Sequence, residues 1–356
     1  MMKARAALRG LGYLVFNAAV AGAVLEGTFV LMLNVPRLAG ATPRPFRRLI
    51  QQVYRHFNRS LIQFDMSCAR YDSALAYTLK PGACFFENVE FRNAFHINRL
   101  GLRDEEASLD APEVIVLGDS HVMGWGVEGD QTLVRVLAQQ SGLKVLNAGV
   151  SSYGTVREMQ LLDRLDVSRL TTLIIQYSDN DLPENRTFRE HGGFLPVMTE
   201  AQYQNIVRHY ARQHSYYPGK YVYRLFMKVF RLEEPEPDQV KMDPVTPIEE
   251  AELFVNVLAH GTRTPLDRVQ VIVFEVNEQL RTPRPFIAAL DEVRRRDTNP
   301  AFVRRLIALD VAKLLTPDDF YILDDHLRAH GHRAIGEALF DLIREQPGQD
   351  TRQGTR

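Results

Sequence analysis

From residue 113 onward, short runs rich in β-branched residues alternate with stretches of helical periodicity. The runs predict strands at 113–117, 143–146, 172–177 and 269–275, with a short further strand at 321–323. The periodic stretches predict helices at 132–140, 156–165, 285–296 and 331–344. Because strands that alternate with helices form parallel sheets covered on both faces, residues 111–345 are predicted to form a three-layer α/β/α domain with a mostly parallel sheet.

A long apolar run lies near the N-terminus. It covers residues 11–33, contains Glu26 as its single charged residue, and follows three basic residues. As a helix at about 1.5 Å per residue, these 23 residues span roughly 35 Å, which is enough for a bilayer core of about 30 Å. We therefore predict one transmembrane anchor in residues 1–35. A signal peptide cleaved near Ala21-Gly22-Ala23 and a buried core helix are the alternatives.

The next segment, residues 36–110, begins with a basic amphipathic stretch. No acidic residue occurs between Glu26 and Asp65, whereas six arginines do. Apolar residues recur there at helical spacing, namely Phe46, Leu49, Ile50, Val53, Phe57 and Leu61. This pattern fits a helix that lies on a lipid surface, and it fits equally well a helix packed on the body of the protein.

The chain has two cysteines, Cys68 and Cys84, on either side of a turn-rich Lys80-Pro81-Gly82 stretch. An even pair of this kind predicts a disulfide formed in an oxidising compartment. Two reduced, buried thiols are the alternative. The basic residues on the two sides of the apolar run do not decide its orientation, but a disulfide would place everything after residue 35 outside the cytoplasm, on the periplasmic or extracellular side.

Composition narrows the class of protein. The 356 residues carry 43 lysines and arginines against 44 aspartates and glutamates, a net charge of −1, which argues against a nucleic-acid-binding protein. With 45% hydrophobic and 24% charged residues, the chain is also unlike a disordered protein. The length suits one large catalytic domain with attachments. Only residues 346–356 are predicted to be a disordered tail.

Chemically capable residues follow the predicted strands. Because sites in parallel sheets lie at the carboxyl ends of the strands, these segments are where chemistry is expected. Together they offer a serine, glycine-flanked backbone N–H groups, an asparagine, and an aspartate/histidine pair, which are the parts of an acyl-transfer site. The segments are Gly118-Asp119-Ser120-His121, Asn147 to Gly154, Ser178-Asp179-Asn180-Asp181 and Asp324-Asp325-His326.

In this order, the four segments resemble the blocks of the SGNH hydrolases, also called the GDSL esterase/lipase family. The resemblance covers about residues 98–344, and the stretch INRLGLRD looks like family members that carry an N-terminal anchor. It implies a flavodoxin-like fold, with Ser120 as nucleophile, His326 as base and Asp324 as its acidic partner. It also implies an oxyanion hole made of the N–H groups of Ser120 and of Ser152 or Gly154, with the Asn180 amide.

Three positions depart from the family pattern. Ser152 and Ser178 stand where glycines are usual, and Ser152 lacks the freedom of glycine to adopt positive φ. The acidic partner stands two residues before His326 instead of three, with Asp325 as a competing candidate. The two-residue spacing resembles a branch that includes bacterial exopolysaccharide O-acetyltransferases.

These features predict a serine-dependent ester hydrolase or O-acyltransferase that acts on acyl esters of a glycan or lipid and is held at the membrane by its N-terminal helix. The alternative is a catalytically silent SGNH-like binding module in cell-envelope polysaccharide assembly. The sequence names no protein partner.

Neither a metal nor a cofactor is predicted. Two aspartates and three histidines crowd into residues 324–332, but no second cluster completes a four-ligand set. The glycines of GWGVEG are not followed by the G-K-[ST] of a phosphate loop.

An insertion at about 185–248 separates the third and fourth predicted strands and is rich in tyrosine. These side chains would either stack on a sugar or lipid above the site or form the aromatic core of helical hairpins. They are Tyr203, Tyr210, Tyr216, Tyr217, Tyr221 and Tyr223.

Overall fold

The computed structural model describes residues 2–230, 243–277 and 285–345, which form parts of two compact units. The predicted tail at 346–356 lies outside the described residues. The boundary between the units falls within helix α8 (Glu200–His214). The first unit comprises Met1–Ser60, Arg208–Gln239 and Ile322–Asp324, and the second comprises Leu61–Val207, Val240–Tyr321 and Asp325–Arg356.

The second unit is built on a parallel sheet of five strands in the order β6-β5-β7-β8-β9. Taken in chain order this is 2-1-3-4-5, the flavodoxin-like doubly wound arrangement. Every residue of β5 and β7 is buried, as expected for central strands covered on both faces. The predicted fold class is therefore confirmed. The strands are β5 (Val114–Gly118), β6 (Val145–Gly149), β7 (Thr172–Tyr177), β8 (Gln270–Glu275) and β9 (Ile307–Leu309).

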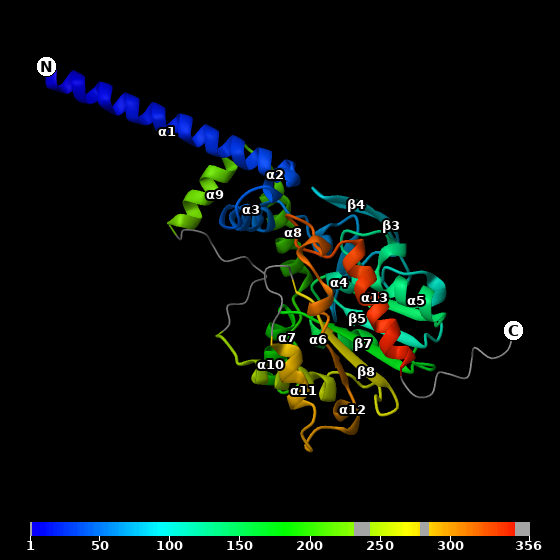
Figure 1. Ribbon diagram of the computed structural model, residues 1–356. Coiled ribbons are helices and arrows are strands. Elements are labelled where there is room, and N and C mark those ends of the chain that lie inside the picture. Colours follow the sequence, from blue (N-terminus) through cyan, green and yellow to red (C-terminus); the bar gives the residue numbers. More distant parts are fainter. Residues whose placement is uncertain (1, 231–242, 278–284, 346–356) are drawn as a thin grey trace. The chain divides into compact units, whose positions relative to one another are not determined.

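Helices form a layer on each side of this sheet (Figure 1). On one side α5 (Leu133–Ser141) packs against α13 (Ala329–Arg344). The helices of the other side pack on one another, namely α6 (Thr155–Leu162), α7 (Asp181–Glu190), α10 (Pro247–His260) and α11 (Phe286–Val293). The remaining short helices are α4 (Ser120–Met123), α12 (Ala301–Arg304) and the 3-10 turns η1 (Ile62–Phe64), η2 (Glu106–Leu109), η3 (Gly129–Gln131), η4 (Ala312–Leu314) and η5 (Pro317–Asp319).

The fifth strand is not where the sequence predicted it. Residues 321–323 form no strand, because Asp325, at a φ of 66°, turns the chain back on itself and leaves only an isolated bridge between Phe320 and Leu327. The sheet is completed instead by β9, which is three residues long. So short a run carries too little periodicity to be recognised.

Two antiparallel hairpins precede the sheet in the chain, and the sequence analysis did not predict them. They pair β1 (Ala69–Asp72) with β2 (Ala76–Leu79), and β3 (Gly82–Asn88) with β4 (Phe91–Ile97). Cys68 and Cys84, 16 residues apart, form the predicted disulfide.

The first unit is helical. Its core gathers Phe29, Leu33, Ile50, Tyr54, Phe57 and Tyr221. The predicted amphipathic stretch is α3, and its apolar face packs into this core, so the structure favours the packed alternative. Within the described residues, α1 is the helix long and apolar enough to cross a membrane, and most of its apolar side chains are exposed. The helices that lie wholly in this unit are α1 (Met2–Asn34), α2 (Pro36–Gly40), α3 (Arg44–Phe57) and α9 (Lys220–Val229).

Candidate active site

Ser120 is the first residue of α4, directly after the central strand β5. The preceding Asp119 caps this helix, because one of its carboxylate oxygens accepts the His121 N–H at 2.8 Å. Its other oxygen accepts the Ser178 hydroxyl at 2.9 Å, and its own N–H donates to the buried Gln176 side chain at 3.0 Å. Asp119 thus joins the ends of β5 and β7 and fixes the turn that presents Ser120.

The helix that carries Ser120 lies against the end of β6 with no spare space. A Cβ on Gly149 would stand 2.3 Å from the Met123 nitrogen, so any larger residue there would displace α4. Asn147 completes this contact. Its amide nitrogen donates to the Val122 carbonyl at 3.0 Å, while its amide oxygen accepts the Gly149 N–H at 3.0 Å.

His326 lies next to Ser120, although 206 positions separate the two in sequence. The Ser120 Oγ and the His326 Nε2 are 2.8 Å apart, and both residues are buried. The Tyr321 N–H donates to the His326 carbonyl at 2.9 Å and closes the turn that carries the imidazole. The indole of Trp125 stacks on the imidazole with centroids 4.6 Å apart and planes at 14°, and the His121 ring is 5.0 Å away.

The two candidate acidic partners differ in their surroundings. Asp324 is buried in the first unit, where its Oδ2 accepts the Tyr54 hydroxyl at 3.1 Å. Asp325 is also buried and belongs to the second unit together with His326. It adopts a φ of 66°, a left-handed conformation that aspartate tolerates better than most residues do.

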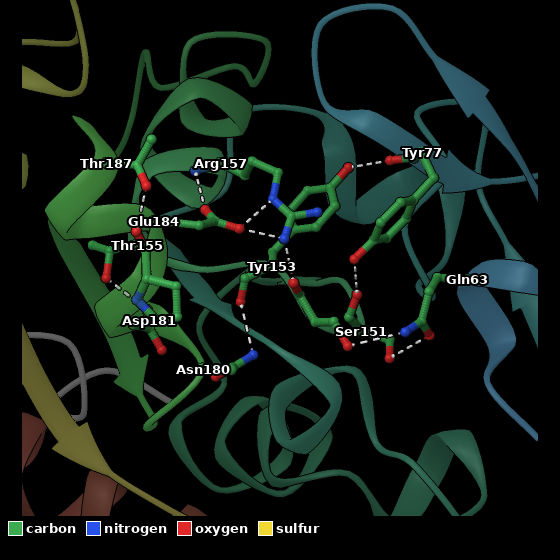
Figure 2. A network of polar contacts seen from close by, with 12 residues as sticks. Gln63, Tyr77, Ser151, Tyr153, Thr155, Arg157, Asn180, Asp181, Glu184 and Thr187 are labelled. Atoms are coloured by element: carbon green, nitrogen blue, oxygen red, sulfur yellow. Dashed lines mark hydrogen bonds and ion pairs between the residues drawn. The ribbon is translucent and has the colours of Figure 1, made fainter. Parts of the chain in front are cut away.

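Ser152, at the glycine position of the family, adopts a positive φ of 58°. This conformation costs of order 1–3 kcal/mol in a residue other than glycine, and its surroundings must hold it. Gln63 does so, because its amide nitrogen donates to the Ser152 hydroxyl and its amide oxygen accepts the Ser151 hydroxyl, both at 3.0 Å (Figure 2). The Tyr77 hydroxyl donates to the Ser151 carbonyl at 2.9 Å. The serine therefore takes the conformation expected of glycine.

A partly buried ion pair supports the same loop from its other side (Figure 2). The Arg157 Nε donates to the Glu184 carboxylate at 2.6 Å, and its Nη2 donates to the Ser152 carbonyl. Burial opposes the charged form of Arg157, yet the attraction of Glu184 prevails and raises its pKa. A Cβ on Gly154 would lie 2.8 Å from the Glu184 carboxyl carbon, so a larger residue there would displace this carboxylate from Arg157.

Asn180 follows β7 and immediately precedes α7. Its amide oxygen lies against the Ser178 hydroxyl, whose one hydrogen is shared between this oxygen and the Asp119 carboxylate. The nitrogen makes one long contact, of 3.5 Å, to the Tyr153 carbonyl (Figure 2). A contact of that length is weak, so the amide hydrogens remain available to a ligand.

Three backbone N–H groups of the predicted oxyanion hole make no hydrogen bond within the described residues. They belong to Ser120, Ser152 and Gly154. Ser120 follows β5, the other two follow β6, and Asn180 follows β7. Because these three parallel strands are neighbours in the sheet, the predicted oxyanion donors all emerge at one edge.

Two buried carboxyl groups lie beneath this edge. Asp181 accepts the Thr155 hydroxyl at 2.6 Å and the Ser178 N–H at 2.9 Å. Glu158 is fully buried, and neither of its carboxyl oxygens has a hydrogen-bond partner in the described part of the chain. Burial raises the pKa of both groups well above the ordinary range, and the neighbouring Asp119 acts in the same direction on each.

Arg103, in the INRLGLRD stretch, organises the loop that follows α4. Its guanidinium is buried and donates to the Gly124 carbonyl at 2.6 Å and to the Val127 carbonyl at 2.8 Å. It also lies 3.6 Å from the centre of the Phe95 ring. Burial lowers the pKa of Arg103 to about 10, so it remains charged at neutral pH. This clamp holds the segment that carries Trp125.

Sequence reasoning missed several residues of this site. Trp125 and His121 stood next to the nucleophile, and the aromatic residue in the Gly-Trp-Gly stretch was a usable signal. Tyr54 lies on the buried face of α3, between Val53 and Phe57, which the sequence analysis had placed on the apolar face of this helix. Arg103 stood in the recognised INRLGLRD stretch without an assigned role, and Gln63 gave no signal, because the partners of both lie far away in the sequence.

Comparison with known proteins gave matches among solved structures only. No family model and no curated protein matched. A protein of the lipolytic G-D-S-L family from Desulfitobacterium hafniense is 16% identical, covers 64% of this chain and 98% of its own, and has a TM-score of 0.32. A family 3 carbohydrate esterase from Clostridium thermocellum is 11% identical, with coverages of 65% and 97% and a TM-score of 0.35.

A third similar structure is a Corynascus thermopiles carbohydrate esterase of family 2 with a carbohydrate-binding domain. It is 15% identical, covers 65% of this chain and 64% of its own, and has a TM-score of 0.37. These likenesses are partial, so the chemistry of this chain rests on its own contacts between Ser120 and His326. In its GDSH, Asn180 and His326 segments, the chain resembles the SGNH/GDSL hydrolase family, to which one of these neighbours is assigned.

Proposed function

We propose that this protein is a serine-dependent ester hydrolase or O-acyltransferase that acts on acyl esters of a glycan or lipid. The observation that carries the proposal is the 2.8 Å contact between the Ser120 Oγ and the His326 Nε2. A serine hydroxyl is a weak nucleophile until an adjacent base accepts its proton, and this distance lies within hydrogen-bond reach.

In the proposed reaction, His326 takes the proton of Ser120 as the Oγ attacks the ester carbonyl carbon. The tetrahedral intermediate then expels the alcohol, which receives the proton from the imidazolium, and the acyl group stays on Ser120. Water or an acceptor hydroxyl, deprotonated by His326, attacks the acyl-enzyme and releases the serine. Water makes the protein an esterase, whereas a sugar hydroxyl makes it a transferase.

The negative charge on the intermediate needs donors that are already in place. We assign this role to the N–H groups of Ser120 and of Ser152 or Gly154, with the Asn180 amide. Each such donor contributes about 10²–10³ in rate. The positive φ of Ser152 supports this assignment, because serine there keeps the backbone conformation available to glycine.

We assign Asp324 as the acidic partner that keeps the imidazole in the correct tautomer, with Asp325 as the competing candidate. Burial of the Asp324 carboxylate and its hydrogen bond from Tyr54 support this order, since an orienting carboxylate is itself held by neighbours. The indole of Trp125 stacks on His326 and holds the plane of its imidazole ring.

We further propose that α1 anchors the protein and that the second unit works outside the cytoplasm. The length and composition of α1 and the disulfide between Cys68 and Cys84 support this placement.

The test is hydrolysis of p-nitrophenyl acetate by the full-length protein in detergent micelles. We expect Ser120→Ala to lose at least 10³-fold in turnover, because the nucleophile is absent. Asp324→Asn should lose far more activity than Asp325→Asn if Asp324 orients the imidazole. Acetyl transfer to an added oligosaccharide, measured against release of acetate, then separates transferase from esterase.

The alternative function is a catalytically silent binding module in cell-envelope polysaccharide assembly. Equal turnover by the wild type and Ser120→Ala, at the level of the buffer reaction, would favour it.

A further inference from the structure

Helix α9 has its polar and apolar faces reversed relative to a water-exposed helix. Its exposed residues, together with the residue that ends it, are Tyr223, Phe226, Val229 and Phe230, with 49, 52, 66 and 60% of each exposed. These positions recur every three or four residues and therefore form one stripe on the helix. An exposed apolar stripe of this kind marks an interaction surface.

Two charged side chains of α9, those of Lys220 and Arg224, pack against the core of the first unit, while the third, Lys228, makes an exposed contact with Gln52. The Lys220 ammonium is 1% exposed and donates to the Phe57 carbonyl at 2.9 Å. The Arg224 guanidinium lies over the Phe57 ring, 4.9 Å from its centre. With two of its three cations inside and aromatic rings outside, the helix suits an apolar medium better than water.

The start of α9 is joined to α1 by a carboxylate. The Glu26 Oε2 accepts the N–H groups of Tyr221 and Val222 at 2.9 and 3.0 Å. These groups belong to the first turn of α9. The N–H groups of a first turn have no acceptor within their own helix, and they give the helix start a partial positive charge. A carboxylate in a membrane helix is costly unless it is paired, and α9 supplies that pairing. In Figure 1, α9 begins close to α1 and extends away from it at an angle.

Between the two helices lies a groove of about 710 Å³. Gly22, Ala23 and Gly27 of α1 form one wall, and Tyr223 and Phe226 of α9 form part of the other. Small residues on α1 open the groove, while the exposed aromatic residues of α9 border it. Its volume falls within the range of about 300–1,000 Å³ that is usual for ligand pockets.

In the proposed topology, the groove lies at membrane depth. If the apolar run of residues 11–33 spans the bilayer, Gly22 stands at its midpoint, and the groove extends from there toward the C-terminal end of α1. That half of the helix faces the outer leaflet in the proposed topology. The residues that line the groove are apolar or aromatic except for Glu26, whose carboxylate is paired with the first turn of α9. A groove of this lining that opens to hydrocarbon is filled by the lipid that surrounds it.

We propose that α9 is inserted beside α1 into the outer leaflet, and that the groove between them binds an acyl chain of a membrane phospholipid. This inference rests on the proposed membrane anchorage. The first unit would then contact lipid through two helices, α1 and α9, instead of through α1 alone.

The first test uses the full-length protein in phospholipid nanodiscs with single cysteines that carry an environment-sensitive fluorophore. Both native cysteines are in the disulfide, so the added thiol reacts alone under non-reducing conditions. The positions are Phe226→Cys on α9, Leu14→Cys on α1, and the exposed Gln140→Cys on α5 as the control. Doxyl-labelled phospholipids quench from the bilayer, and iodide quenches from water.

We expect doxyl lipid to quench the fluorophore at positions 14 and 226 but not at 140. Suppose that doxyl lipid quenches the fluorophore at position 14, and that iodide reaches position 226 as easily as it reaches position 140. This result would overturn the inference and leave the anchorage intact. Absence of doxyl quenching at 14 would refute the anchorage, and the inference with it. Shielding of position 226 from both quenchers would show that a second copy or another protein covers α9, and would also overturn the inference.

The second test addresses the groove. Ala23→Trp fills it, whereas Val24→Trp adds the same ring at the adjacent position, whose side chain is 65% exposed and does not line the groove. After exchange into detergent, phospholipid retained per protein is measured by native mass spectrometry. We expect retention by the wild type and Val24→Trp and a loss of at least fivefold in Ala23→Trp. Equal retention in the two variants, or none in the wild type, would overturn the assignment of the groove.

Discussion

His332 makes the stability of the second unit depend on pH in a way that can be calculated. The imidazole is fully buried on α13, and its Nδ1 accepts the Leu133 N–H, at the start of α5, at 3.3 Å. Burial lowers the pKa of His332 from 6.5 to about 3, and the charges of Arg103 and His326 act in the same direction. A proton on this nitrogen would also remove the only acceptor that the Leu133 N–H has here and place positive charge at a helix N-terminus.

The sign and size of the effect follow from linkage. Because the folded pKa is lower than the unfolded one, His332 contributes stability that is present above pH 6.5 and is lost as the pH falls toward 3. The loss approaches about 1.4 kcal/mol per pH unit and amounts to about 2.3 kcal/mol between pH 6.5 and 4.5, because the unfolded imidazole is half protonated at pH 6.5. For a unit of this size, that corresponds to a fall in Tm of roughly 5–10 °C.

The perturbation is His332→Asn, which keeps an acceptor near the position of the Nδ1 but cannot titrate. His330→Asn, at an exposed position of the same helix, is the matched control. Thermal unfolding of the full chain is followed between pH 4.5 and 7.5 by the fluorescence of its only tryptophan, Trp125, which is buried beside His326. Carboxylates titrate alike in all three proteins and cancel in the comparison.

We expect the Tm of the wild type and of His330→Asn to fall by roughly 5–10 °C more than that of His332→Asn between pH 6.5 and 4.5. Only the slopes are compared, because the asparagine also changes packing at every pH. Identical slopes in His332→Asn and the wild type would refute the reasoning, since the imidazole would then titrate equally in the folded and unfolded states.

Three further predictions concern other parts of the second unit. Gly149→Ala should abolish ester turnover and lower the free energy of unfolding by about 1–3 kcal/mol in a thermal melt, because its Cβ would stand 2.3 Å from the Met123 nitrogen. Unchanged activity would contradict the tight contact of α4 with β6. Burial raises the pKa of Glu158, so the wild type loses stability as the pH rises above 4.5. The unfolding free energy of Glu158→Gln should rise relative to that of the wild type by about 1.4 kcal/mol per pH unit in that range, and parallel profiles of unfolding free energy against pH would argue against this. Replacing Cys68 and Cys84 by serine should lower the unfolding free energy by about 3 kcal/mol for this loop of 16 residues, and an unchanged melting temperature would count against a stabilising disulfide.

The central sheet was predictable because its signals are local. The β7 strand has the predicted bounds, Thr172–Tyr177, since a continuous β-branched run is bounded by polar residues. The β3–β4 hairpin was missed although the burial of Phe91–Ile97 alternates residue by residue, a period visible in the sequence. The β9 strand was missed because three residues carry no period.

Much of the site could be predicted for the same reason. Ser120 and Asn180 directly follow strands, and topology alone brings them to one edge. The conformation of Ser152 could not be predicted, because it depends on Gln63, a partner 89 positions away. The hydrogen bond between Tyr54 and Asp324 spans 270 positions and is likewise a result of the fold alone.

The central claim is that Ser120 is a nucleophile activated by His326, and covalent labelling tests it most directly. The full-length protein is incubated with a fluorophosphonate, digested, and analysed by mass spectrometry. We predict one adduct, on Ser120, in the wild type and none in Ser120→Ala, with a strongly reduced rate of labelling in His326→Ala. Absence of an adduct in protein that melts cooperatively, or an adduct on a different serine, would contradict the claim.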